Sequence, residues 1–244
     1  MDIKTLGQID KTYIEDIVKK ICSKKVHYNE AQLQFNLAWG IREDIVVNNL
    51  VVLLEELTAT GIYNINNKKI NISWYTDIVI YDRTTGEFVC IEVKYKTKED
   101  KNLGLKNHGA YDLGCYDFLW DVKRNEMLKS SIVNKLILNN NDEKEIQRTK
   151  NLYKFIKGYS IIITNDDIYW KNKEDSNSCA KEFFLDDKRI IQKGKILNWL
   201  SSAKFYKNTW RDMSLSFDKD YYCEWFPIKN SKIQTIKGMI FETA

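Results

Sequence analysis

The stretch that decides the fold is SWYTDIVIYD (73–82), followed after the turn RTTG (83–86) by EFVCIEVKYK (87–96). Both runs are rich in Tyr, Ile, Val and Phe, which favour strands, and Gly86 is free to adopt the positive φ of a tight turn. The stretch therefore predicts a β-hairpin. If its loop is centred between Thr84 and Thr85, Asp77 falls directly opposite Glu92.

Charged side chains on one face of this hairpin predict a site. Side chains alternate between the faces of a strand, so Glu92, Lys94 and Lys96 share a face. Cross-strand Cβ atoms lie about 4.5–5.5 Å apart, and two carboxylates this close repel unless a cation or a proton lies between them. Lys94 is one such cation, which would make the group a solvated charge cluster. The surrounding Ile and Val residues indicate a covered sheet instead, and favour a divalent ion such as Mg²⁺.

Apolar residues at helical spacing predict four helices. They lie at 5–23, 30–44, 110–138 and 142–156. Asn29 is a suitable cap for the second helix, which places Glu30 in its first turn. In the third helix, Arg124 and Glu126 with Asp117 and Asp121 have the spacing of intrahelical ion pairs.

Further strands are expected on both sides of the hairpin. The segment 46–58 has features of a strand and of a helix, and its β-branched residues favour a strand. GYSIIITND (158–166) is an apolar run bounded by Gly and Asn-Asp, as in an interior strand. The C-terminal third has candidate strands at 221–228 and 231–241.

Composition limits the class of protein. The 244 residues are 43% hydrophobic with 10 Gly and one Pro, which favours a single globular domain over 1–244. Five Cys without a CxxC pair and two His exclude a zinc ribbon or disulfide scaffold, and leave carboxylates and lysines for chemistry. A formal charge of +4 permits contact with nucleic acid. With no long apolar run and a polar N-terminus, we expect a cytoplasmic protein without a membrane segment.

The order of these features carries a resemblance. A helix with Glu30, a strand, a hairpin with Asp77 and then Glu92-Val93-Lys94, a helix and a strand together resemble the PD-(D/E)XK nuclease superfamily. The segments NEAQLQFNLAWGI, IEVKYKT, YDLGCYDFLWDVKRNE and GYSIIITNDDIYW resemble those of a group of uncharacterised bacterial members. Thr76 stands where the motif name has proline.

The resemblance implies an α/β fold with a restriction-endonuclease-like core. In this fold a central mixed sheet is flanked by helices in the order α-β-β-β-α-β. The nuclease-like core would cover 29–166, after an N-terminal helical part (1–28) and before a C-terminal extension of mixed structure (167–244).

The resemblance also implies roles for the matched residues. Asp77, Glu92 and the backbone carbonyl of Val93 would bind Mg²⁺, for which Mn²⁺ would substitute. Lys94 would orient or help to deprotonate the attacking water and offset charge on the phosphate. Glu30 would reach the metal directly or through water, although a favourable helix-dipole interaction explains a first-turn Glu equally well.

The expected activity is Mg²⁺-dependent hydrolysis of phosphodiester bonds in DNA, by an endonuclease of a restriction, defence or repair type. Duplex DNA is the favoured partner, and we leave open whether two copies act as a homodimer. The alternatives are a non-catalytic DNA- or protein-binding module and an interaction protein with a surface charge cluster. The lysines that end the hairpin and follow it would contact phosphates or be merely solvated: Lys96, Lys98, Lys101 and Lys106.

Overall fold

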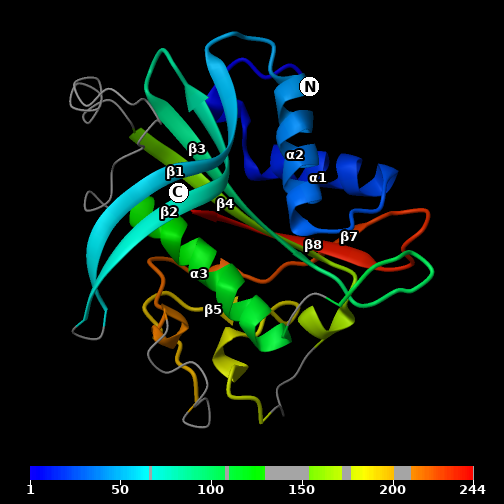
Figure 1. The fold of residues 1–244 in the computed structure, drawn as a ribbon, viewed down its shortest axis with the longest axis vertical. Coiled ribbons are helices and arrows are strands. Elements are labelled where there is room, and N and C mark those ends of the chain that lie inside the picture. Colours follow the sequence, from blue (N-terminus) through cyan, green and yellow to red (C-terminus); the bar gives the residue numbers. More distant parts are fainter. Residues whose placement is uncertain (66–67, 108–109, 130–153, 172–176, 201–209, 244) are drawn as a thin grey trace.

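The fold is built on one mixed sheet with the strand order β1-β2-β3-β4-β8-β7 (Figure 1). The computed structural model describes residues 1–65, 68–107, 110–129, 154–171, 177–200 and 210–243. The strands are β1 (Leu50–Ile65), β2 (Lys68–Asp82), β3 (Glu87–Lys96), β4 (Lys154–Thr164), β7 (Phe226–Ile228) and β8 (Ile236–Thr243). β3 and β4 run parallel and the other neighbours antiparallel. A separate small sheet pairs β5 (Ile190–Ile191) with β6 (Tyr221–Tyr222).

Helices cover both faces of the sheet, with α1 (Lys11–Lys24) and α2 (Glu30–Asp44) on one side and α3 (Tyr111–Lys129) on the other (Figure 1). The first two helices pack with one set of sheet side chains into a single apolar core. α3 packs with the C-terminal part of the chain on the opposite face, around Ile162, Met239 and Phe241. Single 3-10 turns connect other parts of the chain: η1 (Leu6–Gln8), η2 (Asp167–Tyr169), η3 (Lys181–Phe183) and η5 (Trp210–Asp212). Within the described residues, no helix is long and apolar enough to cross a membrane.

Side-chain caps fix where the first two helices begin. Asp10 accepts a hydrogen bond of 2.8 Å from the backbone N–H of Tyr13, and Asn29 accepts one of 2.8 Å from Gln32. The cap at Asn29 confirms that Glu30 is the first residue of α2. The expected helix over 5–23 is wrong in its first turn, because 6–8 is a 3-10 turn and Asp10 caps α1 instead.

The structure confirms the α/β class, the flanked mixed sheet and the hairpin in its expected register. Ile78 pairs with Ile91, and Tyr81 with Phe88. The segment 46–58 is a strand from Leu50 onward. Of the helix expected over 142–156, residues 142–153 lie outside the described residues, and 154–156 instead begin β4. Similarly, α3 is described to Lys129, and 130–138 lie outside the description.

The C-terminal strands are shorter than expected. The run 221–228 is divided into β6 and β7, which belong to different sheets. The run 231–241 becomes a strand only from Ile236, because 229–235 form the connection between β7 and β8. From α2 to β4, the elements follow the expected order of a helix, three strands, a helix and a strand.

His27 is a buried titratable group in the link between α1 and α2. It is 2% exposed, its ring lies edge-on to Tyr95 with centroids 6.3 Å apart, and Nε2 has no hydrogen-bond partner among the described residues. Burial, assisted by the charge of Lys25, lowers the pKa of His27 to about 4. The neutral imidazole is therefore the form that the fold accommodates.

His27 should make the fold sensitive to acid. Because its pKa is lowered in the folded state, its contribution is present above about pH 6.5 and is lost as the pH falls toward 4. The loss at pH 4 should be about 3 kcal/mol of the free energy of unfolding. We expect His27→Gln to flatten this decline when urea unfolding is measured at several pH values in that range. Equal pH dependence in both proteins would contradict the assignment.

Candidate active site

The pairing of β2 with β3 ends where the candidate residues begin. The last backbone pair is Ile78 with Ile91, one residue before Asp77 and Glu92, whereas β3 stays paired with β4 as far as Lys96. β1 is irregular at the same level, since Glu55 has a φ of 51° and the pairing of β1 with β2 passes over it. The sheet is therefore open on the β2 side of the second half of β3.

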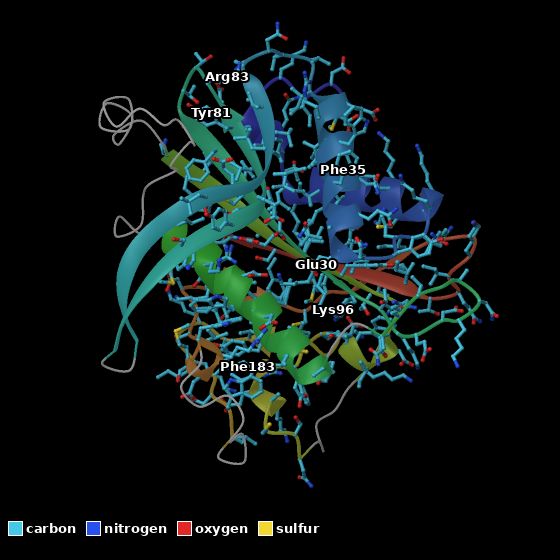
Figure 2. All side chains as sticks on the ribbon, in the orientation of Figure 1. Glu30, Phe35, Tyr81, Arg83, Lys96 and Phe183 are labelled. Atoms are coloured by element: carbon cyan, nitrogen blue, oxygen red, sulfur yellow. The ribbon has the colours of Figure 1, made fainter. Side chains whose placement is uncertain are left out.

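Two carboxylates fill this opening. Asp77 Oδ2 accepts a hydrogen bond of 2.7 Å from the backbone N–H of Val93, and Glu30 Oε2 accepts one of 2.9 Å from the N–H of Tyr95. These N–H groups would otherwise lack the backbone partners that a strand provides. Figure 2 shows Glu30 at the end of α2 that meets the sheet. Glu30, at the N-terminus of α2, and Asp77, on β2, therefore both contact the backbone of the second half of β3.

Two cations hold further carboxylates at the same place. Lys94 Nζ lies 2.9 Å from Asp121 Oδ2 and 3.9 Å from Glu30 Oε1. The guanidinium of Arg124 lies 3.0 Å from Glu92 Oε1 and 3.2 Å from Asp121 Oδ1. We call the six side chains the charged cluster: Glu30, Asp77, Glu92, Lys94, Asp121 and Arg124.

The charged cluster lies at the boundary between the core and water. Glu92 is 2% exposed and Asp121 is 3% exposed, whereas the other four members are only partly buried: Glu30, Asp77, Lys94 and Arg124. With all groups ionised, four carboxylates face two cations. The cluster is therefore short of two positive charges, and its more exposed members mark the side from which a ligand would enter.

Burial shifts the ionisation of two of the acids. Burial raises the pKa of Asp77 to about 7, although Lys94 and the N–H of Val93 oppose the shift. Burial also raises the pKa of Glu92 well above its usual value, against the opposing charge of Arg124. Without a further cation, Asp77 is therefore partly protonated near neutral pH.

The pKa of Lys94 is also raised, which for a lysine favours the charged form. Burial alone would lower its pKa, but the nearby carboxylates, Asp121 first and Glu30 second, raise it overall. The ammonium therefore stays charged in this environment. This state suits Lys94 for orienting a water or offsetting negative charge, and argues against deprotonation of water by Lys94.

The cluster offers Mg²⁺ two carboxylates rather than a complete set of protein ligands. Across the part of the chain that the structure describes, no three His, Cys, Asp or Glu side chains form a group that could hold a metal ion. Mg²⁺, however, needs only one or two carboxylates and keeps several waters. Asp77 and Glu92 are such carboxylates, and Asp77 is bonded to the main chain of Val93. The raised pKa values and the missing positive charge agree with a cation at these two residues.

Asp121 and Arg124 belong to the charged cluster, although their sequence pattern predicts only an intrahelical ion pair. The expected intrahelical pair between them is present, but both side chains also reach across to β3. A signal was available, because Asp121 and Asn125 are in helical register with the apolar residues Phe118 and Val122. A charge on the buried side of a helix requires a partner.

The four lysines assigned to phosphate contact differ in exposure. Lys96 is half-buried, and Lys98, Lys101 and Lys106 are exposed in the connection between β3 and α3. That connection is held by hydrogen bonds, including 2.6 Å from Thr97 Oγ1 to the carbonyl of Lys106 and 2.8 Å from the N–H of Lys98 to Asn165 Oδ1. Their contact with DNA stays a prediction.

Comparisons with known proteins give no relative. No protein-family model matches the chain. No curated protein and no solved structure matches it either.

The pair between Glu92 and Arg124 should be sensitive to removal of one partner. We expect Arg124→Met to lower the free energy of unfolding by about 3 kcal/mol, because it leaves buried carboxylates without their cation. Adding Glu92→Gln should recover part of the loss. Urea unfolding in EDTA at pH 8 measures both effects. Arg83→Met, which changes an exposed arginine, is the matched control and should shift stability by less than about 0.5 kcal/mol. An equally small effect of Arg124→Met would show that the pair is not formed.

Proposed function

We propose that the protein is a Mg²⁺-dependent deoxyribonuclease of the PD-(D/E)XK type, acting as an endonuclease in restriction, defence or repair. In this proposal residues 29–166 form a restriction-endonuclease-like core. The observation that carries it is the meeting of Glu30, Asp77, Glu92 and Lys94 at one opening of the sheet. The order of elements from α2 to β4 supports it.

The chemistry follows from the arrangement of the cluster. Asp77 and Glu92, completed by the carbonyl of Val93 and by water, would hold Mg²⁺. The ion would polarise a phosphoryl oxygen and lower the pKa of a bound water. Lys94, kept charged by Asp121 and Glu30, would place its ammonium where negative charge develops on the phosphate.

Glu30 and Arg124 would act through their neighbours. Glu30 bonds to the N–H of Tyr95 and faces Lys94, so it fixes the end of β3 and the position of the ammonium. Arg124 orients Glu92 and also donates to the carbonyl of Tyr75 at 2.6 Å. These contacts preorganise the groups that would meet the substrate.

The second candidate is a binding module that keeps this arrangement without turnover. It is favoured by the ion pairs of Glu92 and Asp121, which already have cations within the chain. The third class, a surface charge cluster, agrees less well with the burial of Glu92 and Asp121. The raised pKa of Asp77 also favours a cation-binding role over a surface charge cluster.

Cleavage of DNA tests the proposal. We expect nicking of plasmid DNA with Mg²⁺ or Mn²⁺ and none in EDTA. Asp77→Asn, Glu92→Gln and Lys94→Met should each lower the rate by at least about 100-fold, because each removes charge used in the transition state. Lys123→Met is the matched control, since Lys123 pairs with Glu126 outside the cluster.

Metal binding separates the candidates without relying on turnover. Mg²⁺ should raise the melting temperature of the wild-type protein and not that of Asp77→Asn, because a ligand stabilises the state that binds it. A metal-dependent shift without cleavage of plasmid or single-stranded DNA would favour the binding module. No shift together with no cleavage would refute the nuclease.

Salt dependence tests the role of the lysines after β3. If they contact phosphates, changing Lys98, Lys101 and Lys106 together to Ala should flatten the salt dependence of duplex binding by about one unit per lost contact. Fluorescence anisotropy in EDTA measures the slope. A triple change of exposed lysines in the C-terminal part, at Lys193, Lys195 and Lys232, is the control. Equal slopes in all three proteins would mean that the lysines after β3 are only solvated.

A further inference from the structure

A groove lies between the outer side of α2 and the edge strand β1. It encloses about 390 Å³, and its lining includes Phe35, Trp39, Arg42, Val52, Leu54 and Arg83. This size is at the lower end of small-ligand sites, which span about 300–1,000 Å³. Figure 2 shows Phe35 on α2 and Arg83 at the turn that follows β2. The groove lies outside the charged cluster and shares no residue with it.

Aromatic rings form one wall of the groove. Phe35 is 54% exposed and Trp39 is 58% exposed, one turn apart on α2. Their rings are stacked, with centroids 6.3 Å apart and an interplanar angle of 22°. Leu54, 41% exposed on β1, adds apolar surface. Flat apolar rings left in water suit a flat aromatic ligand such as a nucleobase.

Positive charge accompanies the rings. Arg42 and Arg83 are exposed, and in the described part of the chain neither guanidinium forms an ion pair. The neighbouring acids have other partners, since Asp82 accepts from Asn49 at 3.0 Å and Glu43 accepts from the indole N–H of Trp39 at 2.8 Å. Rings with adjacent guanidinium groups complement a base with its phosphate.

The register of the sheet places this groove relative to the charged cluster. Leu54 pairs with Ile78, the residue after Asp77, and Leu50 pairs with Asp82, the residue before Arg83. Four residues of strand span about 13 Å. The β1 wall therefore extends from the level of Asp77 to the level of Arg83, a length of about four stacked nucleotides or fewer extended ones.

We propose that this groove binds an unpaired DNA strand beside the cleavage site, with bases stacked on Phe35 and Trp39 and phosphates at Arg42 and Arg83. This deepens the proposed function and rests on it for the choice of DNA. The substrate would then carry a single-stranded end or flap next to the bond that is cut. A continuous duplex fits less well, because its base faces are covered by neighbouring bases.

Binding without metal tests the groove separately from catalysis. The probes are a fluorescent oligothymidine and a blunt duplex of equal length, followed by anisotropy in EDTA. We expect Phe35→Ala and Trp39→Ala each to weaken oligothymidine binding at least about fivefold, because each removes a stacked base contact. Trp39→Phe should retain most of the affinity. Arg83→Gln should weaken binding and lower the salt slope by about one.

The control is an apolar residue that is as exposed as Trp39 but lies elsewhere on the molecule. Ile196 is 59% exposed and lies outside the groove, so Ile196→Ala should leave both affinities unchanged. Duplex binding should change less than twofold in all groove variants. Urea unfolding checks that each variant is folded, as expected for changes at exposed positions.

The outcomes separate the two proposals. Unchanged oligothymidine affinity in the groove variants overturns the groove proposal, even if the protein cleaves DNA. Loss of affinity in these variants supports it, even if no Mg²⁺-dependent cleavage is found and the nuclease proposal fails. Sedimentation identifies the remaining occupant: a wild-type dimer that Trp39→Ala converts to a monomer makes the groove an interface between copies, and overturns the DNA-strand proposal.

Discussion

The loss of backbone pairing between β2 and β3 beyond Ile78 is the constraint on which the candidate site depends. A buried N–H that loses its strand partner must find another acceptor. Here Asp77 and Glu30 supply that acceptor to Val93 and Tyr95. These two hydrogen bonds thus satisfy the free backbone of β3 and also bring two acids from distant elements to the same point. The site is part of the architecture of the sheet rather than an addition to its surface.

The burial of charge explains why the acids of the cluster need ion pairs. It also explains why the missing positive charge matters. Taking Glu92 and Asp121 out of water is unfavourable unless each has a cation and hydrogen bonds. Arg124 and Lys94 supply the cations, but Asp77 keeps a raised pKa of about 7 despite its neighbours. A structural network alone would be more stable with balanced charge. The imbalance is therefore an argument for a ligand, because functional sites often retain such a cost.

The sequence predicted the local parts of this arrangement better than the distant ones. The alternation and turn chemistry of 73–96 predicted the hairpin and its register, and the cap at Asn29 placed Glu30. The end of the β2 pairing could not be predicted, because alternation and turn chemistry set the register of a hairpin and not the point where its pairing stops. Helix spacing predicts the contact between Asp121 and Arg124 and carries no information about their contacts with β3.

The C-terminal part of the chain contacts α3, the helix that carries Asp121 and Arg124. Arg211 Nε donates to Asp117 Oδ1 at 2.9 Å, and Glu126 Oε1 accepts from the hydroxyl of Tyr221 at 3.0 Å. These contacts anchor α3 four residues before Asp121 and two after Arg124. A side chain placed to within a fraction of an ångström needs its element fixed on both sides. The extension therefore contributes to the geometry of the site, although it supplies none of the six charged groups.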